Sequence, residues 1–375
     1  MTGMSYLGRA VLAILMLSGL ACAQTTTPEE AMRLEQQGKL QEATRAWEQV
    51  IAQNPHDAGA YASLGVLLAR QQQYDRAVAA YRKALAIDSN LQGIELNLGL
   101  ALFKTGQFAA AIPPLRAALS ADPKNVQART LLGMSDYGAK KFDDAVKQLS
   151  MVATVDPDNI ELQRMLAQSC LFVKKYSCAE EAFRVILKQD PKSAAAHVLL
   201  AEALDGLEKP AEAIAEFQAA IDISPREPNV HFGLGFLHWK AHRYSDAKPE
   251  FDKELEIDPA NVEALAYLGD AELKLGNTNR ALSLLQKAVE KKKDMRMVYL
   301  DLGEIFLQRK QYPDAVSAFR RSIELDPSQP DAHYRLAQAY KAMGRTQEAQ
   351  AELAKVQELR QQADNAAMRR SEKSE

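Results

Sequence analysis

The sequence predicts an all-α fold, a stack of about ten copies of one helical hairpin. Three rows of residues lead to this prediction, because all of them recur with a period of 34 residues. One row is always alanine, a second row twelve residues earlier is always Gly or Ala, and a third row twelve residues later is Pro in most copies. The alanine row consists of Ala43, Ala77, Ala111, Ala145, Ala179, Ala213, Ala247, Ala281, Ala315 and Ala349.

Each copy contains two amphipathic segments joined by a short polar turn such as Thr105–Gln107. With the alanine at position 20 of a repeat numbered 1 to 34, apolar residues occupy positions 4, 7, 8 and 11 and then 20, 24 and 27, which is helical spacing. Glu254, at position 27, is one charge out of this pattern. Because a glycine inside a helix costs about 1 kcal/mol, the small residues at position 8 indicate helices in close contact. The repeats start at residues 24, 58, 92, 126, 160, 194, 228, 262, 296 and 330 and together span residues 24–363.

This pattern resembles the tetratricopeptide repeat, a 34-residue helix–turn–helix unit with aromatic, Leu-Gly, Ala and Pro residues at set positions. The second repeat shows the motif in Tyr61, Leu64, Gly65, Ala77 and Tyr81. The first and last repeats match it poorly, as capping repeats do, because each has one face in water. The resemblance implies a right-handed superhelical solenoid whose role is to bind other proteins.

The first segment, residues 1–23, differs from the repeats and predicts a secretory signal peptide. Arg9 precedes an apolar run of twelve residues, and cleavage is predicted between Ala23 and Gln24. A membrane-spanning helix needs ~20 apolar residues, so we expect no transmembrane span in the mature chain. We therefore expect an exported protein, periplasmic or secreted. The alternative is a lipid anchor at Cys22, which would make the protein an outer-membrane lipoprotein.

Composition and motifs argue against nucleic-acid binding and against catalysis. The chain carries 46 Lys and Arg against 49 Asp and Glu, and its longest basic run, Lys291–Lys293, is flanked by acidic residues. It therefore lacks the basic stripe of a nucleic-acid-binding protein. The sequence contains no phosphate-binding glycine loop, nucleophile elbow or zinc-helix motif, and residues 364–375 are only a short polar tail. We expect no catalytic residue, no cofactor and no metal site.

Histidine and cysteine are two residue types of this chain that could bind a metal. His231 and His238 occupy positions 4 and 11, where other repeats have core residues, and His242 lies in a turn, so we expect packing rather than metal binding. Cys170 and Cys178 lie on the two helices of the fifth repeat. Export would permit a disulfide, with the two Cα atoms near the outer limit for bridging; a pair of small core thiols is the simpler interpretation.

The candidate binding surface follows from helix geometry. If positions 3, 4, 7, 8, 10 and 11 pack inside the stack, a rotation of 100° per residue brings positions 2, 5, 9 and 12 together on the remaining face. The family resemblance implies that this face lines a concave groove for extended peptides or helices. An alternative is that these side chains lean into neighbouring helices. The predicted groove residues are Val66, Leu96, Leu100, Phe103, Met134, Tyr137, Glu202, Asp205, Phe232, Phe236 and Trp239.

The sequence thus favours a non-catalytic scaffold in the cell envelope that binds an extended peptide or helix of an unidentified protein. One alternative is a lipid-anchored subunit of an outer-membrane assembly or pilus complex. Another is a targeting module for a separate glycosyltransferase.

Overall fold

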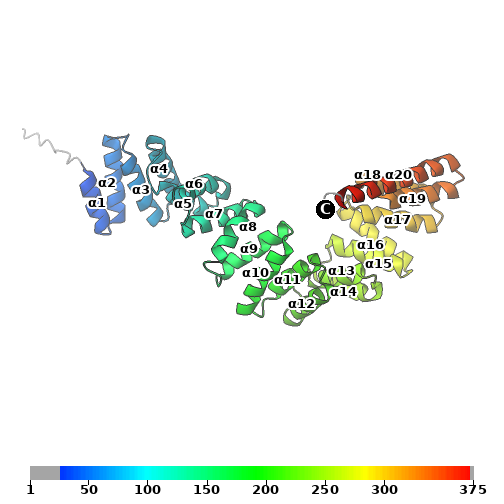
Figure 1. Ribbon diagram of the computed structural model, residues 1–375. Helices are drawn as coiled ribbons and strands as arrows, with labels where there is room; N and C mark the ends of the chain where they lie inside the picture. Colours follow the sequence, from blue (N-terminus) through cyan, green and yellow to red (C-terminus); the bar gives the residue numbers. More distant parts are fainter. Residues whose placement is uncertain (1–25, 372–375) are drawn as a thin grey trace, which may run out of the picture. The chain divides into compact units, whose positions relative to one another are not determined.

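The computed structural model describes residues 26–371, and the all-α fold class is confirmed: the described residues form twenty helices and no strand (Figure 1). The predicted cleavage site between Ala23 and Gln24, and Cys22, lie outside the described residues. The chain divides into two compact units, Met1–Ala139 and Lys140–Glu375, called unit 1 and unit 2 below. Each unit is described by itself.

The helices come in pairs, one pair in each 34-residue repeat. In unit 1 they are α1 (Pro28–Gln36), α2 (Leu40–Gln53), α3 (Ala58–Arg70), α4 (Tyr74–Ile87), α5 (Ile94–Lys104), α6 (Phe108–Ala121) and α7 (Val126–Gly138). In unit 2 they are α8 (Phe142–Ala153), α9 (Ile160–Phe172), α10 (Tyr176–Gln189), α11 (Ala194–Gly206), α12 (Pro210–Ile223), α13 (Val230–Lys240), α14 (Tyr244–Ile257), α15 (Val262–Lys274), α16 (Thr278–Lys291), α17 (Arg296–Gln308), α18 (Tyr312–Leu325), α19 (Pro330–Ala342) and α20 (Thr346–Ser371).

The turn inside each repeat has one backbone conformation throughout. Position 15 has a positive φ in all ten repeats, with Gly in four of them and residues such as Gln72 (φ 59°) in the others. The next backbone N–H donates to the carbonyl of position 11, as from Gln73 to Leu68 at 2.9 Å. This is the Schellman arrangement, which satisfies carbonyls that a helix end leaves free. The first helix therefore stops at the same point in every repeat.

The start of the first helix is fixed in many repeats by a side-chain cap. Asp57, Asn125 and Asn261 are examples, and each accepts a hydrogen bond from the backbone N–H three residues later, at 2.8–2.9 Å. Such caps satisfy an N–H group that has no partner within the helix. Together with the turn, they explain why each repeat begins and ends its helices in register.

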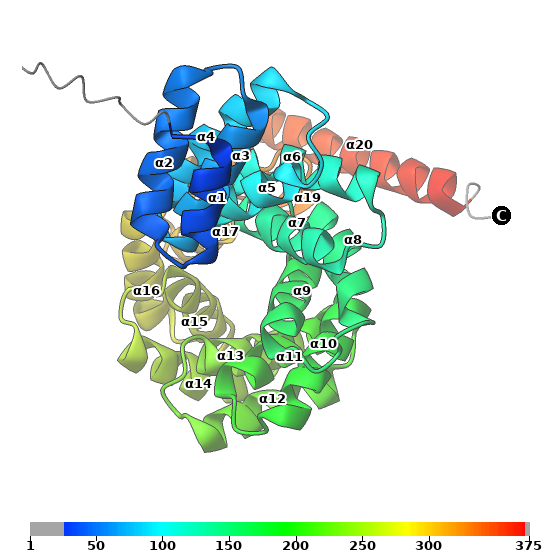
Figure 2. The same cartoon turned by 90° about the vertical axis from the view of Figure 1, so that its left-hand side faces the viewer.

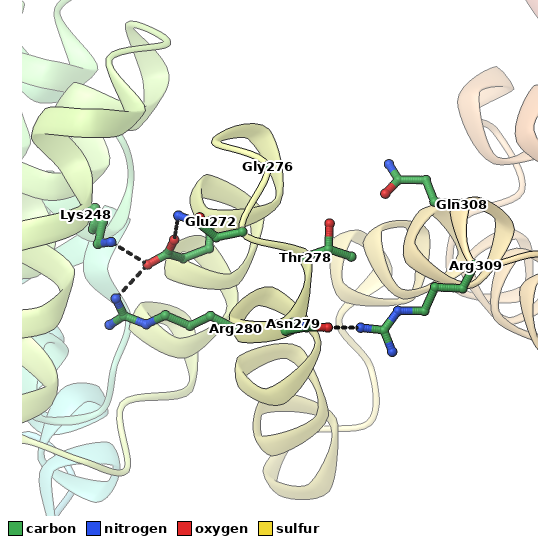
Figure 3. Close-up of a pocket in the computed structure, with 9 residues that line it drawn as sticks. Lys248, Glu272, Gly276, Thr278, Asn279, Arg280, Gln308 and Arg309 are labelled. Carbon is green, nitrogen blue, oxygen red and sulfur yellow. Dashed lines mark hydrogen bonds and ion pairs between the residues drawn. The ribbon is translucent and has the colours of Figure 1, made fainter.

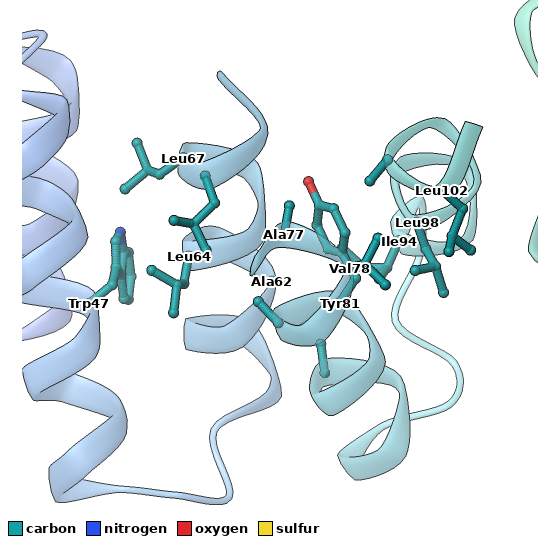
Figure 4. Packing of buried hydrophobic residues seen from close by; sticks show 14 of the residues in the cluster. Trp47, Ala62, Leu64, Leu67, Ala77, Val78, Tyr81, Ile94, Leu98 and Leu102 are labelled. Carbon is teal, nitrogen blue, oxygen red and sulfur yellow. The ribbon is translucent and has the colours of Figure 1, made fainter. Parts of the chain in front are cut away.

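The small residue at position 8 brings the two helices of a repeat together. A Cβ added to Gly65 of α3 would lie 2.5 Å from the ring of Tyr81 in α4, and one added to Gly303 of α17 would lie 2.4 Å from Phe319 in α18. The alanines at position 20, such as Ala77, are fully buried at the same contact. In unit 1, side chains from α2, α3, α4 and α5 form one continuous apolar cluster (Figure 4).

Repeats stack in order along each unit. The second helix of a repeat packs against the first helix of the next, and odd-numbered helices of unit 2 also contact one another, α11 with α13 and α13 with α15. Figure 2 shows α9, α11, α13 and α15 on the inner side of the curve of unit 2, with α10, α12, α14 and α16 outside. The odd-numbered helices α9 to α15 therefore carry the inner side of unit 2.

The predicted tail begins inside a helix, because α20 continues to Ser371. No helix among residues 26–371 combines the length and the apolar character that crossing a bilayer requires.

Cys170 of α9 and Cys178 of α10 are joined in the structure by a disulfide, with sulfur atoms 2.02 Å apart. Their Cα atoms lie 5.9 Å apart, near the middle of the usual range for disulfides rather than at its outer limit. The structure therefore contains a disulfide bond between these cysteines, whereas the simpler interpretation of the sequence was a pair of free thiols.

Glu254 of α14 is the charged residue at position 27, where an apolar residue is expected. Its side chain stabilises the start of α13. Its side chain is 1% exposed, and its two carboxylate oxygens accept hydrogen bonds from the backbone N–H groups of Asn229 and Phe232, both at 3.1 Å. Asn229 itself has a left-handed conformation (φ 64°) and provides no side-chain cap. A carboxylate from the neighbouring helix therefore replaces the missing cap and favours the positive helix end.

We expect Glu254→Ala to lower the free energy of unfolding by about 2 kcal/mol or more, because it leaves two backbone N–H groups without their charged acceptor. Glu256→Ala, an exposed change on the same helix, is the matched control and should have little effect. Urea unfolding followed by circular dichroism measures both. Equal midpoints for the two variants would contradict this role of Glu254.

Candidate functional site

The predicted groove residues of unit 1 are partly covered by their neighbours. They are Val66, Leu96, Leu100, Phe103, Met134 and Tyr137, and all six have intermediate exposure. Val66, Leu96, Leu100 and Phe103 pack against the core of unit 1, and the ring of Phe103 lies 5.5 Å from that of Phe108. Much of this apolar surface therefore leans into adjacent helices, as the alternative interpretation expects.

The predicted aromatic residues of unit 2 form one cluster on α13, which Tyr267 of α15 completes. Phe236 lies between Phe232 and Trp239, with ring centroids 6.1 and 5.8 Å away. Tyr267 meets Phe236 edge-on at 5.1 Å and Trp239 at 4.8 Å. All four side chains are half-buried, so each presents one side to the inner face.

Polar residues continue this surface from α13 towards α17. The indole N–H of Trp239 donates to a carboxylate oxygen of Asp270 at 2.6 Å, and Lys274 pairs with the same carboxylate at 3.5 Å. Asp301 of α17 is 3% exposed. Burial raises the pKa of Asp301 well above its usual range, and the nearby negative charge of Asp270 raises it further.

These contacts follow one spacing rule, which the sequence analysis missed. Position 9 of a repeat meets position 6 of the next, 31 residues later, in the pairs Phe236–Tyr267 and Glu304–Arg335, the second an ion pair at 3.3 Å. Trp239–Asp270 has the same spacing, from position 12 to position 9. Tyr267 and Asp270 could have been selected from the sequence by testing pairs at this separation.

The two predicted acidic residues differ in their partners. Asp205 of α11 forms an ion pair with Lys240 at 2.6 Å. Glu202 forms no hydrogen bond or ion pair with any residue in the described part of the chain. Both line a pocket of about 280 Å³ between α11 and α13, whose other walls include Phe232 and Phe236. The structure thus brings the acidic and aromatic residues that were predicted for unit 2 to one place.

We use the term inner face of unit 2 for this surface of α11, α13, α15 and α17. It consists of Glu202, Asp205, Phe232, Phe236, Trp239, Tyr267, Asp270 and Asp301.

The histidines predicted to pack in the core have specific partners. His231 is 4% exposed, with Nδ1 2.6 Å from a carboxylate oxygen of Glu250 and Nε2 3.1 Å from the carbonyl of Pro225. The pairs His197–Glu216 and His333–Glu352 repeat the first contact. His238 is half-buried and His242 lies in a turn with positive φ. Within residues 26–371 no three potential ligands gather at a metal-binding distance.

A larger pocket, of about 790 Å³, lies beside the turn between α15 and α16 (Figure 3). One of its lining residues is Glu272, whose fully buried carboxylate pairs with Lys248 at 3.0 Å and Arg280 at 2.7 Å and accepts a hydrogen bond from Asn277 at 2.6 Å. These charges satisfy one another within the fold. The pocket is therefore a structural ion-pair network and a weaker candidate than the inner face.

We expect Asp301→Asn to raise the free energy of unfolding at pH 8. The folded state raises the pKa of Asp301 above that of the unfolded chain, so the folded state binds more protons and the carboxyl group destabilises the fold as the pH rises. The gain should shrink as the pH falls towards the ordinary aspartate pKa of about 4. Urea unfolding at pH 8 and pH 5 measures it, with exposed Asp294→Asn as control; a variant less stable than wild type at pH 8 would contradict this.

Comparison with known proteins agrees with the repeat architecture. Sequence models described as tetratricopeptide repeat match residues 29–91 and 164–228, residues 102–169 and 238–300, and residues 330–362, and a model described as TPR repeat matches residues 303–344. No curated protein matched the sequence.

Two solved structures share the fold. The APC/C hetero-tetramer Cut9–Hcn1 is 14% identical, with 88% of this chain and 80% of that chain covered and a TM-score of 0.51. A tetratricopeptide repeat protein from Parabacteroides merdae is 16% identical, with coverage of 65% and 97% and a TM-score of 0.50. YrrB, a TPR protein described as having an unusual peptide-binding site, is 24% identical, with coverage of 48% and 93% and a TM-score of 0.43. The chain belongs to the tetratricopeptide repeat family.

Proposed function

We propose that this protein is a non-catalytic scaffold that holds an extended segment of a partner protein on the inner face of unit 2. The observation that carries the proposal is the row of four half-buried aromatic rings, Phe232, Phe236, Trp239 and Tyr267, beside a pocket with an acidic rim. Tetratricopeptide repeats are protein-interaction modules, and the matching family models indicate no enzyme.

The free energies involved favour an extended partner over one that makes a single contact. An aromatic side chain buries ~150–250 Å², worth a few kcal/mol at ~25 cal/mol/Å², and the rings of α13 are already half covered. Association costs on the order of 4–15 kcal/mol. A segment that touches several repeats is therefore needed. The six predicted residues of unit 1 are proposed as a second, shallower contact surface.

The site calls for a test that leaves the packing in place. Trp239 donates a hydrogen bond to buried Asp270, and Phe232 packs against the core of its unit, so replacing either would disturb the fold as well as the surface. A photo-cross-linking amino acid at a single position avoids this difficulty.

We expect a photo-cross-linker placed at Glu202 in the living cell to capture one partner, because this exposed position lines the pocket of the inner face. The matched controls are Glu181 on α10 and Glu256 on α14, exposed positions on outer helices. Capture is read by gel shift and mass spectrometry. Equal capture from the outer positions, or capture from them alone, would refute the assignment.

We further propose that the protein is exported, as a periplasmic or secreted protein. The predicted signal segment at residues 1–23 supports export, and the Cys170–Cys178 disulfide suits an oxidising compartment. The alternative, a lipid-anchored subunit of an outer-membrane or pilus assembly, predicts a different N-terminus.

Intact-mass analysis of the protein from its native cell separates these proposals. Soluble export predicts a chain that starts at an unmodified Gln24, whereas a lipid anchor predicts acylated Cys22 at the N-terminus. The thiol count without reduction is read from the same sample. A chain that retains Met1 and carries three free thiols, those of Cys22, Cys170 and Cys178, would contradict export in either form.

A further inference from the structure

On the inner face of unit 2, side chains at position 9 meet side chains at position 6 of the next repeat. Phe236 meets Tyr267, Asp270 lies beside Asp301, and Glu304 pairs with Arg335. In the repeat before these, position 9 is Glu202 and the facing position 6 is Gly233. Glu202 therefore faces a residue that has no side chain to meet it.

A close contact with Phe217 explains why residue 233 is a glycine. A Cβ added to Gly233 would lie 2.2 Å from Cζ of Phe217, and Phe217 is a buried ring of α12, 2% exposed. Any other residue at 233 would displace this ring. The glycine thus serves the packing of Phe217, but it leaves the space in front of Glu202 without a side chain from this chain.

That space is the pocket of about 280 Å³, which Glu202, Asp205, Phe217, Phe232, Gly233 and Phe236 line. The volume lies just below the ~300–1,000 Å³ of sites for whole small molecules, so it suits one large side chain. The lining includes three aromatic rings, those of Phe217, Phe232 and Phe236, and two carboxylates, those of Glu202 and Asp205. Such surroundings match a side chain with an apolar stem and a cationic end.

Only one of the two carboxylates of the pocket is neutralised from within the chain. Lys240 pairs with Asp205 at 2.6 Å, whereas Glu202 has no partner in the described part of the chain. Glu202 is exposed to solvent, so its carboxylate is accessible to a cation from a partner. Such a cation would favour the charged form of Glu202.

The chain itself shows which group fits opposite a glutamate at this position. Glu304 and Arg335 occupy the same repeat positions as Glu202 and Gly233, and there an arginine guanidinium lies 3.3 Å from the carboxylate. Arginine also stacks on aromatic rings and can bond a carboxylate through two N–H groups.

We propose that the pocket between α11 and α13 binds an arginine side chain of the partner segment, with the guanidinium on Glu202 and the stem against Phe232 and Phe236. This inference rests on the proposed function, because it assumes that an extended segment lies on the inner face of unit 2. Within that function it assigns the chemistry of one anchor.

The experiment uses phage-displayed dodecapeptides selected on the full chain, followed by fluorescence anisotropy with the selected peptide. We expect the selected sequences to share an arginine flanked by apolar residues. Replacing that arginine with citrulline, a neutral residue of nearly the same shape, should weaken binding about tenfold or more, as expected for a lost charge-assisted hydrogen bond.

Glu202→Gln should cause a similar loss for the arginine peptide and almost none for the citrulline peptide, while exposed Glu181→Gln on α10 leaves both affinities unchanged. Circular dichroism melting checks that both variants fold. Selected peptides without a shared basic residue, or an arginine peptide that binds Glu202→Gln as tightly as wild type, would overturn the arginine site and leave the scaffold function standing. Failure to select any peptide would count against both.

Discussion

The close contact between the two helices of each repeat is the constraint on which the rest of the structure depends. It requires a residue without a large side chain at position 8, such as Gly65 or Gly303, and an alanine at position 20. Position 15 has a positive φ in all ten repeats, and within unit 1 and within unit 2 a Schellman turn at this position holds the paired helices in register. Since every repeat keeps the same register, side chains of neighbouring repeats meet at fixed separations.

The fixed separation of 31 residues organises the inner face of unit 2. It brings Trp239 to Asp270 and Glu304 to Arg335, so most polar groups of this surface are satisfied by the next repeat along the chain. Groups satisfied in this way stabilise the stack and offer little to a ligand. Glu202 is the contrast, because its counterpart is a glycine that the packing of Phe217 requires.

The sequence predicted the helical hairpins, their number and the packing of the histidines because those features depend on spacing within one repeat. It placed Phe232, Phe236 and Trp239 on one surface for the same reason. It missed Tyr267, which occupies position 6 and joins that surface only through contacts between repeats. Asp270 was not selected either, although position 9 belongs to the predicted face. It also did not reveal that Glu254 caps α13, because this contact joins a side chain of α14 to the start of the preceding helix, and spacing within one helix does not predict such a contact.

Exposure was the least predictable property. Helix geometry correctly separates the faces of one helix, but the exposed fraction of Leu96 or Phe103 depends on how closely the next helix lies, and both prove half-buried. The disulfide is a similar case. Positions 11 and 19 of the fifth repeat lie closer than the separate helix patterns indicated, with 5.9 Å between the Cα atoms.

Hydrogen exchange of the full chain, alone and bound to the partner recovered from cells, tests the central claim most directly. The account predicts slower exchange on binding in α11, α13 and α15, the helices that carry the inner face of unit 2. Protection confined to outer helices such as α12 and α14, or to unit 1, would contradict it.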